Sequence, residues 1–143
     1  MPLTALRQLT EELGMRPSDV LWASYELSQF PKLISTFDGN IVLANRALED
    51  LLGFSEDELR AVGWMNLTHP DDLALDMEYA ERLAAGEFFY YQIRKRYRKA
   101  DGEYLWIYLN AERVDIAGHD PIAVCLIQDS PQEGLKIMGT RPR

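Results

Sequence analysis

Alternating apolar and polar positions in the second half of the chain predict three strands, at residues 88–97, 103–114 and 122–128. In the second strand the alternation separates an apolar face from an aromatic face: Leu105, Ile107, Leu109 and Ala111 on the first, and Tyr104, Trp106 and Tyr108 on the second. Neither face is wholly polar, so both faces of the sheet need cover.

A hairpin is predicted before these strands, because β-compatible runs at 33–37 and 41–44 flank the dipeptide Asp38-Gly39. This dipeptide tolerates the positive φ angles of a tight hairpin turn. Together with the three later strands, the hairpin predicts a five-stranded antiparallel sheet.

Two short helices are predicted directly after the hairpin. Asn45 is placed to cap the first of them, and Gly53 marks its end. Ser55 and Glu58 have the spacing of a reciprocal capping box, which predicts that the second helix continues to Ala61.

A longer helix is predicted from Pro70 to about Ala85. Asp71 and Asp72 fall in its first turn, where the helix dipole favours negative charge. Its apolar residues share one face, which we expect to pack inward: Leu73, Met77, Ala80 and Ala84. Its charged residues are expected to point mostly elsewhere: Asp76, Glu78, Glu81 and Arg82.

The N-terminal region predicts a helical pair. Leucines at helical spacing indicate a short amphipathic helix within residues 3–13: Leu3, Leu6, Leu9 and Leu13. Ser18 is expected to cap a second helix that ends near Phe30, because Pro31 disfavours helix at the residue before it. This pair, a partner chain, or both would cover the aromatic face of the sheet.

The chain of 143 residues fits one core domain, because 47% of its residues are hydrophobic. We expect an N-terminal helical extension at 1–31, the domain at 32–129 and a C-terminal tail or linker at 130–143. The 15 basic and 23 acidic side chains give a net charge of −8, which disfavours binding to nucleic acid. No apolar run approaches the ~20 residues that span a bilayer, so no membrane association is expected and the predicted location is cytoplasmic.

The segment Leu67-Thr68-His69-Pro70-Asp71-Asp72, with the helix and paired strands after it, resembles the second half of a PAS sensory domain. Segments 37–45 and 51–59 resemble the opening hairpin and short helices of that family. The resemblance extends over roughly Lys32 to Asp129 and indicates the subtype with a His-Pro-Asp-Asp helix start. It implies an α+β PAS fold, with short helices on one face of the sheet. It also implies a signal-transduction role, as in bacterial histidine kinases, diguanylate cyclases and transcription regulators.

The C-terminal end departs from the family pattern. Members coupled to an effector usually leave the last strand through a short acidic-threonine motif into a long helix. Here the chain continues with Asp129-Ser130-Pro131 and then Gly134, and this proline and glycine disfavour an immediate helix. Relay through a rigid C-terminal helix is therefore not favoured.

The resemblance implies no cofactor for this chain. Flavin-binding members place a reactive cysteine in an Asn-Cys-Arg motif, whereas Cys125 lies in an apolar run typical of a small buried hydrophobe. Haem-binding members use a histidine on the central helix, and residues 70–85 contain none. His69 and His119 have no second ligand at metal-binding spacing. We therefore expect a colourless protein with neither cofactor nor metal.

The sequence contains no glycine-rich phosphate loop and no Ser-His-Asp or Cys-His motif, so enzymatic activity is not expected. The basic run at 94–99 includes an aromatic residue, as some phosphate binders do. Successive strand residues point to opposite faces, so these charges do not converge on one groove. An arginine of the run remains within reach of an acidic ligand.

These observations favour a sensor that binds a small apolar ligand or a partner and relays the change to an effector domain or partner protein. The candidate pocket lies between the long helix and the sheet: Trp64, Asn66, Met77, Ala80, Leu105, Ile107 and Leu109. Thr68 or Tyr79 would orient the ligand. The alternative is a PAS fold with a filled core that only binds a protein or itself. A homodimer is expected, through the N-terminal helices and the outer face of the sheet.

Overall fold

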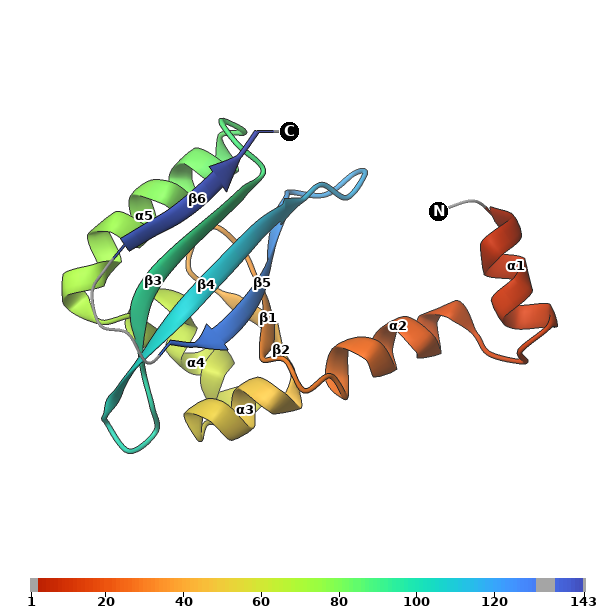
Figure 1. Ribbon diagram of the computed structural model, residues 1–143, viewed down its shortest axis with the longest axis horizontal. Coiled ribbons are helices and arrows are strands. Elements are labelled where there is room, and N and C mark those ends of the chain that lie inside the picture. Colours follow the sequence, from red (N-terminus) through yellow and green to blue (C-terminus); the bar gives the residue numbers. More distant parts are fainter. Residues whose placement is uncertain (1–2, 131–135, 143) are drawn as a thin grey trace.

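The computed structural model describes residues 3–130 and 136–142. It is an α+β fold built on an antiparallel sheet of six strands in the order β2-β1-β5-β4-β3-β6 (Figure 1). The strands are β1 Lys32–Ser35, β2 Ile41–Ala44, β3 Tyr90–Arg98, β4 Tyr104–Val114, β5 Ile122–Asp129 and β6 Lys136–Arg141. The α+β fold with an antiparallel sheet that was expected from the sequence is confirmed.

The sixth strand corrects the expected count of five. β6 lies in the stretch predicted as tail or linker and pairs with the edge of β3. Pro131 and Gly134 discourage a helix after β5, but they do not prevent a new strand beyond them. The pairing depends on a distant edge, so no local pattern in the sequence predicted it.

Five helices accompany the sheet: α1 Leu3–Glu11, α2 Pro17–Glu26, α3 Arg46–Leu52, α4 Glu56–Leu67 and α5 Pro70–Ala84. α3, α4 and α5 lie on one face of the sheet and enclose the hydrophobic core with it (Figure 1). The predicted caps are present: the Asn45 side chain accepts from Leu48 N, and Ser55 and Glu58 form a capping box. Local capping signals therefore fixed the starts of α3 and α4.

α4 continues beyond the predicted end at Ala61 and bends at Gly63. Gly63 has a φ of 75°, and a Cβ at this position would lie 2.8 Å from Gly39 O. The bend lets Trp64 N donate to Gly39 O at 3.0 Å, while Trp64 Nε1 donates to Thr36 O at 3.0 Å. Glycine at this position therefore brings the indole against the β1–β2 turn and the core.

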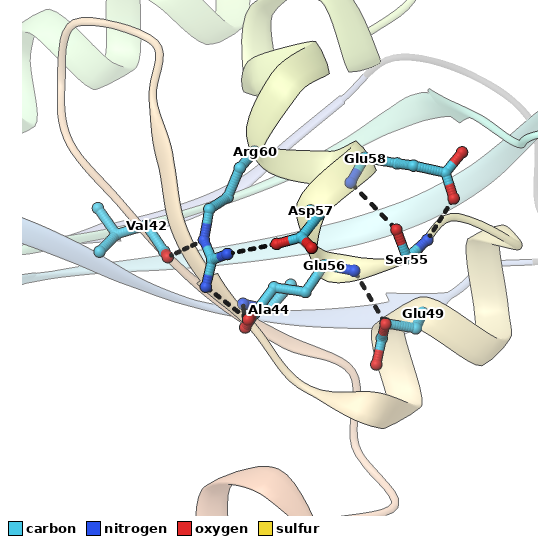
Figure 2. A network of polar contacts seen from close by, with 8 residues as sticks. All are labelled: Val42, Ala44, Glu49, Ser55, Glu56, Asp57, Glu58 and Arg60. Atoms are coloured by element: carbon cyan, nitrogen blue, oxygen red, sulfur yellow. Dashed lines mark hydrogen bonds and ion pairs between the residues drawn. The ribbon is translucent and has the colours of Figure 1, made fainter.

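The free edge of β2 is covered by side chains from α4 (Figure 2). Arg60 Nε donates to Val42 O at 2.9 Å, and Glu56 Oε2 accepts from Ala44 N at 3.0 Å. Arg60 also bonds Glu56 Oε1 and Asp57 Oδ1, so the two covering side chains support each other. Backbone groups that would otherwise attract another strand are thus occupied.

α1 and α2 form an arm that extends away from the sheet instead of covering its outer face (Figure 1). The predicted Ser18 cap is wrong, because Pro17 already occupies the first turn of α2 and Arg16 takes the cap position. α2 ends at Glu26, short of Phe30, and has no buried residue. Large apolar side chains of the arm and its link to β1 are exposed: Leu13, Met15, Leu21, Trp22, Leu27 and Phe30.

Asn45 attaches this arm to the domain. Its side chain is fully buried, and Nδ2 donates to the carbonyls of Tyr25 and Phe30, both at 2.9 Å. Its Oδ1 accepts from Lys32 N and Leu48 N. One amide therefore joins the end of α2, the start of β1 and the first turn of α3.

Candidate functional site

A salt bridge between β3 and α5 lies inside the core. Lys95 and Asp76 are each 1% exposed, and Lys95 Nζ lies 2.5 Å from Asp76 Oδ2. Lys95 Nζ also donates to Thr68 Oγ1 at 2.8 Å. Lys95 shares the inward positions of β3 with Ile93 and Tyr97, so the strand alternation itself carries the ammonium group into the core.

Aromatic groups complete the surroundings of this ion pair. Lys95 Nζ lies 4.4 Å from the ring centroid of Tyr97 and 5.9 Å from that of Trp64, positions at which a ring face attracts a cation. Tyr91 OH donates to Asp76 Oδ1 at 2.8 Å. Both members of the pair thus have further partners, which a buried salt bridge needs in order to offset the loss of hydration.

The other titratable groups around the pair are neutral at physiological pH. Burial raises the pKa of Tyr91 well above its usual value, and the nearby Asp76 carboxylate raises it further. Burial likewise raises the pKa of Tyr97. Burial raises the pKa of the Cys125 thiol to about 12. The charge of this interior site is therefore carried by Lys95 and Asp76.

Asp72 makes a second attachment of α5 to β3, one helical turn before Asp76. It is 1% exposed and accepts from Arg96 N at 2.8 Å, Nε at 3.0 Å and Nη2 at 2.8 Å. Burial acts to raise the pKa of Asp72, but the hydrogen bonds and charge of Arg96 outweigh it and hold that pKa below its usual value. The first turn of α5 is therefore fixed to the strand.

A cavity of about 20 Å³ lies between α5 and the sheet, beside the Lys95–Asp76 pair. Three predicted pocket residues line it: Trp64, Ala80 and Leu109. Polar lining comes from Asp76, Lys95 and Tyr91, together with Ser35 and Cys125. This volume matches about one water molecule, so the cavity is too small to hold an organic ligand.

The remaining predicted pocket residues lie elsewhere. Ile107 is fully buried in the core without lining the cavity, and Met77 and Leu105 are partly buried against that core. Asn66 is exposed, and its Nδ2 donates to Val62 O. Of the two candidate orienting residues, Thr68 bonds Lys95, whereas the ring of Tyr79 packs against Phe88 and Tyr91.

Asp76 corrects the expectation that the charged residues of α5 point away from the core. The buried face of the helix consists of Asp72, Asp76, Ala80 and Leu83. Asp76 stands four residues before Ala80 and so shares its face. The available signal was the inward position of Lys95 in β3, because a buried cation requires an anion on the element that faces it.

The basic run divides between the two faces of the sheet, as the alternation predicted. Lys95 enters the core, while the guanidinium groups of Arg94 and Arg96 lie over the outer rings of Tyr108 and Trp106, at 4.9 and 4.6 Å. Arg94 thus covers the ring of Tyr108, whereas Arg96 combines its ring contact with the hydrogen bonds to Asp72.

The described part of the chain contains neither a metal-binding cluster nor a membrane-spanning helix. No three His, Cys, Asp or Glu side chains there are grouped to hold a metal ion. His69 acts as a helix cap, with Nδ1 accepting from Asp71 N at 3.0 Å and its ring packed against Tyr104. Over residues 3–130 and 136–142, no helix combines the length and apolar character needed to cross a membrane.

An antiparallel sheet with helices on one face and a central helix bonded to it across the core defines an α+β domain. A family model described as the PAS fold matches residues 41–123, and the chain belongs to this family. It is similar to the probable diguanylate cyclase DgcE of Escherichia coli (strain K12), with 38% identity over 72 residues. That match spans 50% of the chain but 6% of the relative, so it transfers no catalytic activity to this chain.

Solved structures support the same fold. The PAS domain of an HTR-like protein from Haloarcula marismortui aligns with a TM-score of 0.69 and 18% identity, over 87% of this chain and 98% of that one. A domain of a sensory box sensor histidine kinase/response regulator from Geobacter sulfurreducens aligns with a TM-score of 0.64 and 21% identity, over 82% and 97%. The family match and these relatives support a role in sensory signal transduction.

Proposed function

We propose that this chain is a sensory module that binds a small ligand in its core and relays the change to an effector. The observation that carries the proposal is the buried Lys95–Asp76 pair, which joins α5 to β3 beside an interior cavity. A ligand that enlarges the cavity moves α5 relative to β3 and so weakens this pair. Ligand binding and helix position are thereby coupled.

The site favours an uncharged, mainly apolar ligand. Lys95 and Asp76 already neutralise each other, so an additional buried charge would have no counter-ion. Leu109, Ala80 and Trp64 supply apolar surface, and a single hydroxyl or carbonyl on the ligand would have the ion pair as its partner. The bonds between Asp72 and Arg96 hold the first turn of α5, so the helix would swing about that turn.

NMR titration tests this proposal. A library of small neutral compounds is added to the isotope-labelled chain, and amide shifts are mapped. The expected hits move the amides of Lys95, Asp76 and Leu109, and lose affinity for the Leu109→Trp variant, whose larger side chain leaves no room for a ligand between α5 and the sheet. If the library moves only surface amides in the natural chain, the interior does not bind ligands of this class, and the interaction module becomes the better proposal.

The second candidate function is homodimerisation, and the arm is the observation that favours it. Six large apolar side chains between Leu13 and Phe30 are exposed. The outer face of the sheet has a groove of about 500 Å³ with Val124 and Leu126 among its lining residues. The exposed apolar side chains of the arm and the apolar part of this open groove favour placing the arm of one copy on the sheet of another.

Light scattering with charged variants tests the dimer. Leu21→Asp combined with Trp22→Asp places charges on the exposed side of α2 without touching the Asn45 contacts. We expect a lower molar mass than for the natural chain. Asp19→Ala on the same helix is the matched control and should leave the mass unchanged; equal masses for all three proteins would argue against the dimer.

We further propose an effector, a PAS subtype and a cellular location for this chain. The similarity to a cyclase and the fold of a kinase sensor domain favour a bacterial regulator whose effector is an attached domain or a partner protein. Pro70 in the first turn of α5 and the buried Asp72 support the subtype with a His-Pro-Asp-Asp start. We propose a cytoplasmic setting, with residues 32–129 as the sensory unit and 1–31 as its arm.

A further inference from the structure

The outer edge of β3 is covered by two different segments. Near the C-terminal end of β3, Thr68 bridges Tyr97 and His69 N donates to Arg96 O at 3.0 Å. The other half, Tyr90–Arg94, is paired with β6 in antiparallel register. The first cover comes from the α4–α5 connection and belongs to the body of the domain, whereas the second comes from a separate C-terminal segment.

β6 is attached to the domain mainly through this one edge. Its partner in the sheet is β3, and Phe89 N donates to Arg141 O at 2.9 Å. The Arg141 guanidinium lies 4.6 Å from the ring centroid of Tyr90. Thr140 and Arg141 are exposed, so the described side chains of β6 add little to the core. Pairing with a single strand through backbone hydrogen bonds is a modest attachment, since each bond contributes about 0.5–1.5 kcal/mol net.

A short segment connects strands β5 and β6, and its first residue, Ser130, is held by the sheet. Ser130 is 2% exposed and donates from its backbone N to Trp106 O at 2.9 Å. Five residues separate Ser130 from Lys136 in the sequence. The segment 136–141 is therefore tethered to a fixed point of the sheet while its own contacts lie on a different strand.

We propose that the β3 edge at Tyr90–Arg94 is a strand-addition site through which two copies of this chain exchange residues 136–141. In the exchange, residues 136–141 of each copy pair with β3 of the other copy in the register seen within one chain. Both copies use the same surface, so the assembly closes as a two-fold dimer. Leaving the edge empty would expose unpaired N–H and C=O groups, so the site is filled either within one chain or between two. Arg60 and Glu56 already cover the β2 edge, which directs strand addition to β3.

The exchange goes beyond the proposed sensory function, because it requires no ligand and does not use the arm. It also makes a distinct prediction about protein concentration. Pairing within one chain is independent of concentration, whereas pairing between chains grows with it by mass action. A covalent trap across the β3–β6 pair can therefore tell the two apart.

Cysteine trapping in the full chain is the test. Gln92 and Gly139 are register partners, and a Cβ at Gly139 meets open space, so Gln92→Cys with Gly139→Cys places two thiols across this edge. Glu112→Cys with Val124→Cys is the matched control on the β4–β5 pair. Both pairs are made in a Cys125→Ala background, equilibrated over a range of concentrations, oxidised mildly and separated on non-reducing gels.

The expected result is a covalent dimer whose share rises with concentration for the β3–β6 pair, and a disulfide within single chains at every concentration for the control pair. Disulfides only within single chains for both pairs would overturn the exchange and make β6 a permanent strand of its own sheet. No disulfide across the β3–β6 pair, with a normal control, would overturn the pairing on which the proposal rests. Covalent dimers for both pairs would show unspecific collision and overturn it as well.

Discussion

Lys95 and Asp76 form a salt bridge within the hydrophobic core, with 2.5 Å between Nζ and Oδ2 and 1% exposure for each side chain. They stand nineteen positions apart in the sequence, and they connect the central helix to the sheet. Removing one member of such a pair lowers the free energy of unfolding more than removing both, because the remaining charge is then buried without a counter-ion. This asymmetry gives the first prediction.

Asp76→Leu alone should lower the free energy of unfolding by about 3–5 kcal/mol, because the Lys95 ammonium loses its counter-ion. Asp76→Leu combined with Lys95→Met should recover most of that loss, since neither charge then remains in the core. Denaturant unfolding of the single and double variants measures both values. Arg16→Ala, which removes an exposed salt bridge to Asp19, is the control and should change little. Additive losses in the double variant would contradict a coupled pair.

Asp72 should make the stability depend on pH in the acidic range. Its pKa in the folded chain lies below the usual 3.8, so the folded state favours the carboxylate. The resulting stabilisation is complete above the unfolded pKa and disappears as the pH falls through the lower folded pKa. The difference in unfolding free energy between the natural chain and Asp72→Asn should therefore be constant near neutral pH and shrink below about pH 4.

The control for this titration is Asp71→Asn. The Asp71 side chain is 80% exposed and lies 4.0 Å from Arg96, so its loss should produce a much weaker pH dependence. Unfolding curves recorded from neutral to acidic pH give both differences. A constant difference for Asp72→Asn down to the lowest pH would mean that its carboxylate is not stabilised by Arg96.

Gly63 should not tolerate a side chain. Gly63→Ala forces an L residue into a φ of 75° and a ψ of 157°, a conformation reserved for glycine, at a cost of about 1–3 kcal/mol. The added Cβ also meets Gly39 O at 2.8 Å, so the full loss should exceed that range. Gly118→Ala, at a φ of 79° and with no atom within 4 Å of the added Cβ, is the control for a positive φ without a steric contact. Equal losses in chemical unfolding would mean that the contact with Gly39 is not important.

Local signals in the sequence were sufficient for most elements. Asn45 and Gly53 fixed both ends of α3, and Ser55 and Glu58 fixed the start of α4, because a cap needs only residues within one helical turn. The hairpin at Asp38-Gly39 followed from turn chemistry in the same way. Features decided within a few residues were thus predictable.

The buried Lys95–Asp76 pair and strand β6 were not predicted, because both depend on partners that are distant in the sequence. Asp76 belongs to the core because Lys95 arrives from another strand, and β6 forms because the β3 edge lacks another partner along Tyr90–Arg94. A local rule assigns a charged residue to the surface and a Pro-Gly segment to a loop. Only the position of the distant partner reverses these assignments.

Leu109 provides the test of how firmly the core is closed. It is 3% exposed and lines the cavity of about 20 Å³ between α5 and the sheet. This space is too small for the extra ring atoms of an indole, so Leu109→Trp should overpack the core and lower the free energy of unfolding by about 1–3 kcal/mol. Leu105→Trp, on the same strand but outside the cavity lining, serves as the control. If denaturant unfolding finds no loss for Leu109→Trp, α5 and the sheet separate easily in solution, and the interior holds far more space than its closed form.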